Sequence, residues 1–124
     1  ALITGQVLGT DADGLTTLAI DGGILRLTAP RREPHAPGTT LRVRVQARDV
    51  SVALQEPRQI SVNNVLPATV QGLTDDGPGQ VLVTLQLGDR TSLLARLTQG
   101  SVQRLGLATG LPVFALIKGV AVLR

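Results

Sequence analysis

Residues 38–47 read GTTLRVRVQA and residues 110–119 read GLPVFALIKG, and these two stretches determine the predicted fold. The apolar residues that alternate with their neighbours are Leu41, Val43 and Val45 in the first stretch, and Val113, Ala115 and Ile117 in the second. Side chains on a strand point to opposite faces in turn, so each stretch predicts a strand with one apolar face. The two stretches lie 72 positions apart (110 − 38), which indicates an internal repeat.

The rest of the chain supports a repeated all-β fold. Residues 5–9 (GQVLG) match residues 68–72 (ATVQG), and an Asp-rich turn follows each of them. Residues 50–54 and 81–87 also alternate, and Asp-Gly and Gly-Asp turns separate the runs, as hairpins require. The sequence therefore predicts two tandem OB-like small β-barrels, residues 1–57 and 58–124, each with about five short strands.

One short helix is predicted, in the second unit. Residues 98–106 (TQGSVQRLG) begin with Thr98, a good N-cap, and end at Gly106, a good C-cap. The corresponding stretch of the first unit, residues 28–37, contains three prolines and predicts an irregular loop.

Composition disfavours most enzymes. The chain has 124 residues, of which 43% are hydrophobic, with no cysteine, a single histidine and Phe114 as its one aromatic residue. A disulfide scaffold, a thiolate metal site and a Cys nucleophile are excluded, and His35 in the proline-rich stretch is interpreted as a bystander. Phosphate-loop and nucleophile-elbow motifs are absent, and Asp75 and Asp76 read as a solvated turn. We therefore expect a binding module rather than an enzyme.

Three polar segments of the second unit combine into a candidate anion site. They supply Ser61, Asn63 and Asn64 before a strand, Thr98 and Ser101 at the start of the helix, and Lys118 and Gly119 after the last long strand. A helix start offers unpaired N–H donors, and Lys118 adds one full charge. Gly119 lets a backbone N–H approach an anion closely. Taken singly, each segment also fits an ordinary turn, cap or strand end, but together they suit a tetrahedral oxyanion with a charge near −2.

The order of these segments carries a family resemblance. The series Ser-x-x-Asn-Val, Thr-x-x-Ser and Ile-Lys-Gly-Val resembles the Mop, or TOBE, domain, and the repeated unit resembles the di-Mop arrangement. Residues 45–52 are similar to a stretch of the TOBE regions of ABC transporter ATPases, and residues 59–66 resemble the corresponding sequence of the ATP-binding subunit of molybdate importers. The resemblance implies molybdate or tungstate as the ligand, bound at subunit interfaces, with no further cofactor. Asn63 departs from the family pattern, which typically has arginine at this point of the opening motif.

The resemblance implies a regulatory domain that senses cytoplasmic molybdate or tungstate and promotes dimerisation of the subunit. Its partners would be a second copy, the ATPase domain of the parent chain and, through that domain, the membrane permease, at the inner face of the cell membrane. The fragment itself would not hydrolyse ATP.

Two alternatives stay open at this point. Asn63 favours a purely structural dimerisation module with a decayed anion site. An OB-like nucleic-acid binder would use Arg42, Arg44 and Arg48, but Phe114 is the one aromatic residue available for base stacking and the net charge is only +3. We therefore expect no nucleic-acid partner.

Overall fold

The computed structural model describes residues 1–28 and 35–123 of the chain. The elements, in chain order, are β1 (Leu2–Thr10), β2 (Thr16–Ile20), β3 (Gly23–Leu27), β4 (Thr40–Arg44), the 3₁₀ turn η1 (Ala47–Asp49), β5 (Val50–Ala53), β6 (Asn64–Asp75), β7 (Gln80–Leu87), β8 (Thr91–Thr98), α1 (Gln99–Leu105), β9 (Pro112–Ile117) and β10 (Ala121–Val122). The part of the predicted proline-rich loop at residues 29–34 lies outside the described residues.

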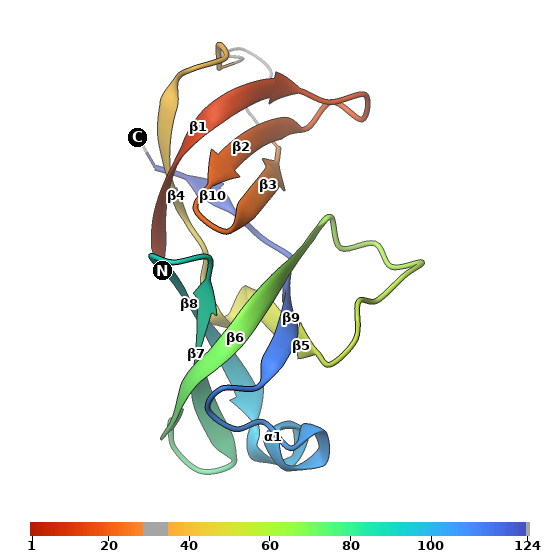
Figure 1. Ribbon diagram of the computed structural model, residues 1–124, viewed down its shortest axis with the longest axis vertical. Helices are drawn as coiled ribbons and strands as arrows, with labels where there is room; N and C mark the ends of the chain where they lie inside the picture. The colour runs from red at the N-terminus through yellow and green to blue at the C-terminus, as the bar shows by residue number, and fades with distance from the viewer. Residues whose placement is uncertain (29–34, 124) are drawn as a thin grey trace.

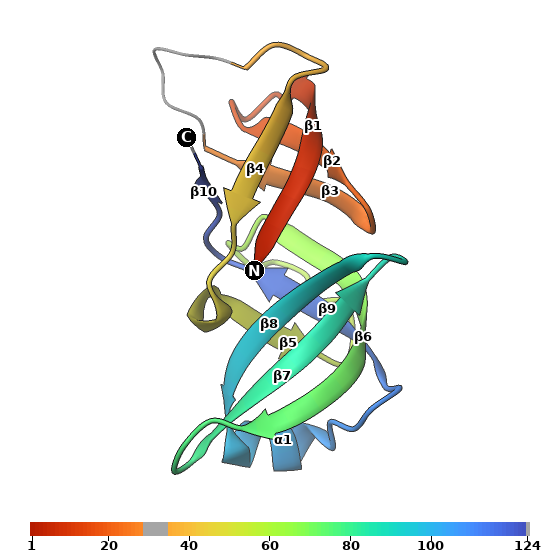
Figure 2. The same cartoon turned by 90° about the vertical axis from the view of Figure 1, so that its left-hand side faces the viewer.

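Two curled sheets of five strands follow one another along the long axis of the molecule (Figures 1 and 2). The first sheet has the order β10-β4-β1-β2-β3, and the second has the order β5-β9-β6-β7-β8. Every strand pairing is antiparallel. Each sheet forms a half-barrel, and the predicted fold class of two OB-like units with one helix is confirmed.

The core is built from aliphatic side chains on the inward face of each sheet. In β7, for example, Val81, Val83, Leu85 and Leu87 are buried while the residues between them are half-buried. Phe114 faces outward from β9 and is half-buried. The period-2 pattern of the sequence thus marks the strand faces correctly, because burial of the apolar face is what fixes the register of a strand.

The internal repeat is visible in the irregularities of the strands. The pairing of β1 with β2 shifts register between Val7 and Gly9, and the pairing of β6 with β7 shifts between Val70 and Gly72, 63 positions later (70 − 7 and 72 − 9). β-bulges re-aim a strand and increase its twist, so a bulge at the same place bends both units alike.

Each unit ends in a strand that joins the sheet of the other unit. β5 lies before residue 57 but pairs with β9 in the second sheet, and β10 pairs with β4 in the first sheet. The sheets therefore do not follow a simple division of the chain at residue 57. The exchange ties the two units together through backbone hydrogen bonds.

The helix α1 forms over the residues predicted for it. The Thr98 Oγ1 accepts a hydrogen bond from the Ser101 backbone N–H at 3.1 Å, and Gly106 ends the helix in the left-handed conformation with a φ of 65°. Within the part of the chain that the structure describes, no helix has the length and apolar character needed to cross a membrane.

Candidate functional site

A cavity of about 170 Å³ lies between the two units and contains four of the seven predicted site residues. Its lining consists of Leu15, Arg26, Leu27, Thr28, Asn63, Asn64, Lys118, Gly119 and Val120. The first four of these belong to the first unit, and the remainder belong to the second. We call this cavity the interunit pocket.

The pairing of β6 with β9 brings the asparagines and the lysine together. Asn64 is the first residue of β6 and lies opposite Ile117, the last residue of β9, so Asn63 and Lys118 lie at the same end of these two strands. Lys118 is exposed, and its backbone N–H donates to the Asp49 carbonyl at 2.9 Å. Asn63 and Lys118 are both exposed, and both line the interunit pocket.

Gly119 faces the side chain of Asp49. A Cβ at position 119 would lie 3.1 Å from the Asp49 Oδ2 and 3.3 Å from its Cγ, which is closer than an ordinary contact. The absence of a side chain thus lets the chain after β9 pass close to η1. It also places a carboxylate near the pocket, and its charge reduces the net positive field of Lys118 there.

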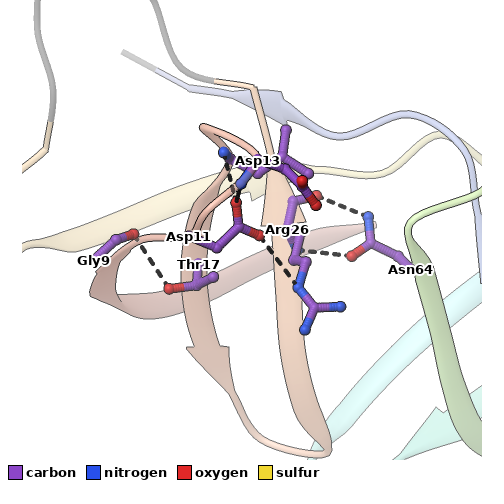
Figure 3. Close-up of polar contacts among 7 residues, drawn as sticks. Gly9, Asp11, Asp13, Thr17, Arg26 and Asn64 are labelled. Carbon is purple, nitrogen blue, oxygen red and sulfur yellow. Dashed lines mark hydrogen bonds and ion pairs between the residues drawn. The ribbon is translucent and has the colours of Figure 1, made fainter.

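Asn64 is buried, with 4% of its surface exposed, and its amide makes two hydrogen bonds to one residue of the first unit (Figure 3). The Oδ1 accepts from the Arg26 backbone N–H at 2.7 Å, and the Nδ2 donates to the Arg26 carbonyl at 2.9 Å. The side chain thereby pairs with β3 as the backbone of a neighbouring strand would. Two of the four hydrogen bonds that an amide can make are thus used inside the protein.

Arg26 lines the interunit pocket but was not among the predicted site residues. Its guanidinium lies 3.6 Å from the Asp11 carboxylate, and its side chain is about half exposed at 52%. Arg96 and Asp76 form an ion pair in the second unit, at 2.7 Å. Contact of Leu15, Arg26 and Thr28 with the second unit could not be predicted, because the family motifs lie wholly in that unit.

Ser61, Thr98 and Ser101 do not line the interunit pocket. Ser61 is exposed in the segment between β5 and β6. Thr98 and Ser101 lie at the start of α1, at the far end of the second sheet (Figure 1). The Thr98 hydroxyl is within hydrogen-bond distance of the Ser101 hydroxyl, at 2.8 Å. A single chain therefore brings together part of the predicted constellation and leaves these three hydroxyls apart from it.

A second contact between the units involves Asp21 in the β2–β3 turn. Its Oδ2 accepts a hydrogen bond from the Arg90 backbone N–H in the β7–β8 turn. This bond, followed by the backbone N–H groups of Asp89 and Thr91 and the charge of Arg90, lowers the pKa of Asp21 against a weaker opposing effect of desolvation. The carboxylate is thus held in its ionised form at the junction of the two turns.

An open groove of about 810 Å³ runs over the outer face of the second sheet. It is lined by Gly22, Leu54, Pro67, Ala68, Thr69, Gln86, Gly88, Pro112, Val113 and Phe114. Phe114 lies between Pro67 of β6 and Ala53 of β5. This groove is more apolar than the interunit pocket, and we call it the outer groove.

Known proteins are similar to this chain in sequence. The chain is 50% identical over 113 residues to the molybdenum import ATP-binding protein ModC of Albidiferax ferrireducens, covering 91% of this chain and 30% of the relative. The ModC of Bordetella parapertussis is 44% identical over 124 residues, covering 98% of this chain and 33% of the relative. The chain thus spans about a third of the length of these relatives.

The fold is also found in the cytoplasmic molybdate-binding protein ModG, solved with molybdate bound. The two structures superpose with a TM-score of 0.80 at 24% identity, over 99% of this chain and 93% of ModG, which establishes the shared fold. The family model for the TOBE domain matches residues 60–123, more than half of the chain. The chain therefore belongs to the TOBE domain family.

Proposed function

We propose that this chain is a regulatory domain that binds molybdate or tungstate and forms part of the ATP-binding subunit of a molybdate ABC importer. Two observations on its relatives support this proposal. The curated relatives are named as molybdenum import ATP-binding proteins and are about three times as long as the chain. The structural neighbour ModG was solved with molybdate bound.

The interunit pocket is the observation that carries the proposal. Lys118 supplies a full positive charge, Asn63 supplies amide donors, and Gly119 lines the pocket beside them with no side chain of its own. A tetrahedral dianion needs hydrogen-bond donors around it and few acceptors. Hydrogen bonds from a charged donor such as an ammonium are stronger than those from a neutral donor. A pocket of about 170 Å³ has room for such an anion and an ordered water.

A second copy of the chain would complete the site. Ser61, Thr98 and Ser101 lie away from Lys118 within one chain, and in a dimer the hydroxyls of one protomer would face the pocket of the other. The outer groove supports such a dimer, because Phe114 and Leu54 leave apolar surface exposed to water. Anion binding at the interface would then stabilise the dimer and report the anion concentration to the ATPase.

The partners follow from this role. The domain would act on the ATPase domain of its parent chain and, through it, on the membrane permease. Imported molybdate accumulates on the cytoplasmic side, so a domain that senses it belongs on the cytoplasmic face of the membrane.

A dimerisation module with a decayed anion site is the second candidate function. Two observations favour it: Asn63 stands where the family motif typically has arginine, and the Asn64 amide is engaged with Arg26. Loss of a forked, charged donor lowers the affinity for an oxyanion. In this case the outer groove would hold the dimer together, and the interunit pocket would bind no anion.

Calorimetric titration with molybdate, tungstate, sulfate and phosphate at fixed ionic strength, alongside analytical ultracentrifugation, separates the two. We expect heat of binding for molybdate and tungstate, and a dimer whose stability increases with the bound anion. A dimer that takes up none of the four anions would establish the decayed-site alternative. A monomer under all conditions would refute dimerisation in both candidates.

A further inference from the structure

β3 is an edge strand whose outer side is covered by a side chain rather than by another strand. It ends the order of the first sheet, so among residues 1–28 and 35–123 its outward N–H and C=O groups have no strand partner. At Arg26 both groups are instead satisfied by the amide of Asn64, 38 positions away in the sequence. A buried side chain that pairs with backbone in this way fixes the distance between two elements.

We propose that Asn64 is a positioning residue of the anion site, which sets the width of the interunit pocket, and not a ligand of the anion. The inference rests on the proposed function. It assigns to Asn64 a role different from that implied by the family motif, in which the asparagine is grouped with the ligands.

The arrangement of the pocket walls supports this role. One wall is β3, in which Arg26 makes the hydrogen bonds to Asn64. The other wall is the start of β6 together with the chain after β9. Asn63 precedes Asn64 in the chain, and Ile117, the residue before Lys118, lies opposite Asn64 in the sheet. The two bonds to Arg26 therefore hold both donor groups of the second unit at a fixed distance from the first unit.

The hydrogen-bonding capacity of the Asn64 amide supports it further. The Oδ1 accepts from one N–H and the Nδ2 donates one of its two N–H groups to a carbonyl, and with only 4% of the residue exposed the second N–H has little surface to offer an anion. Breaking those bonds would leave the Arg26 backbone groups unsatisfied, at a free-energy cost. Anion binding is therefore favoured more when Asn64 keeps its bonds to Arg26, because those bonds hold the pocket at the width that the anion needs.

The contact at Asp21 provides a matched control. It also joins the two units, through the Arg90 backbone N–H, but neither residue lines the interunit pocket. Loss of the Asp21 contact loosens the units at the β7–β8 turn, whereas loss of the Asn64 contact loosens them at the pocket. If weaker contact between the units lowers molybdate affinity in general, variants at both Asp21 and Asn64 should lose affinity. If Asn64 positions the pocket, only the Asn64 variant should lose affinity.

The experiment compares molybdate affinity by calorimetry in wild-type protein, Asn64→Ala and Asp21→Ala, with urea unfolding to find conditions in which all three are folded. We expect Asn64→Ala to weaken molybdate binding about 10- to 100-fold, the loss typical of removing an outer-shell partner at a metal site. We expect Asp21→Ala to stay within about twofold of wild type. Equal affinity in Asn64→Ala and wild type, or equal losses in both variants, would overturn the inference. Failure of the wild-type protein to bind molybdate would instead overturn the proposed function.

Amide hydrogen exchange on the wild-type protein provides a test that does not depend on the folding of a variant. Molybdate should slow exchange at the Arg26 N–H more than at the Arg90 N–H, because anion binding and the Asn64 contact stabilise each other. Unchanged exchange at Arg26 would refute the link. A complex with molybdate in which an anion oxygen accepts a hydrogen bond from the Asn64 Nδ2 would show that Asn64 is a ligand after all.

Discussion

Replacing Gly22 by alanine should destabilise the protein more than the same change at Gly14, and the difference measures the contact between the β2–β3 and β7–β8 turns. Both glycines have positive φ, +106° at Gly22 and +81° at Gly14. A non-glycine residue in such a conformation costs about 1–3 kcal/mol, and the entropy lost by the unfolded chain is the same for both changes. Backbone strain therefore contributes similarly to the two variants.

The two positions differ in their surroundings. A Cβ on Gly22 would lie 2.8 Å from the Gly88 N and 2.8 Å from the Leu87 C, whereas a Cβ on Gly14 would meet nothing within 4 Å. The two turns would have to move apart by about 0.6 Å to reach the shortest ordinary contact of 3.4 Å (3.4 − 2.8). Overpacking of this kind costs about 1–3 kcal/mol, so we expect Gly22→Ala to be less stable than Gly14→Ala by that amount.

Urea unfolding followed by far-UV circular dichroism measures both free energies of unfolding. Gly14→Ala reports the strain alone, and the excess loss in Gly22→Ala reports the contact between the units. Equal losses in the two variants would refute the close approach of the turns. A loss in Gly22→Ala accompanied by a lower denaturant m-value would indicate that the two units no longer unfold together.

Three further predictions concern stability and assembly. The pKa of Asp21 is lowered in the folded protein, so its ionised form stabilises the fold. Wild type should therefore be more stable than Asp21→Asn above about pH 4, and this difference should disappear as the pH falls further. Urea midpoints of the two proteins at pH 7 and pH 3 measure the difference. Leu85→Ala removes a side chain with 0% exposure and should cost about 2–5 kcal/mol, whereas Leu8→Ala, at 51% exposure, should cost less than about 0.5 kcal/mol in thermal or urea unfolding. Phe114→Asp should shift the protein toward monomer in sedimentation equilibrium, and Ile24→Asp on the outer face of the first sheet should not; equal behaviour of these two variants would place the dimer contact elsewhere.

The strands and the helix were predicted correctly because short-range sequence patterns specify them. Alternation of aliphatic residues in β7 and β9 marks the buried face, and the caps Thr98 and Gly106 mark the ends of α1. Each of these signals lies within a few residues of the structure it specifies. They are sufficient for strands, turns and a helix because these elements depend on neighbouring residues.

The exchange of strands between the units could not be read in this way. β10 has two residues and β5 has four, so neither carries a pattern that distinguishes one sheet from the other. The same holds for the pairing of Asn64 with Arg26, which joins residues 38 positions apart. Motif order grouped seven residues into one site, and four of them (Asn63, Asn64, Lys118 and Gly119) line the interunit pocket. It did not indicate that the first unit would form the opposite wall.

The affinity for molybdate of Lys118→Ala relative to wild type tests the central claim most directly. Lys118 is the one lysine of the chain, and loss of its charge-assisted hydrogen bond to a dianion should weaken binding by about 2–3 kcal/mol, or about 30- to 150-fold. Arg42→Ala removes one charge from an exposed position on β4 outside the interunit pocket and should stay within about twofold of wild type. Unchanged molybdate affinity in Lys118→Ala, measured by calorimetry at the same ionic strength, would contradict the assignment of the interunit pocket as the anion site.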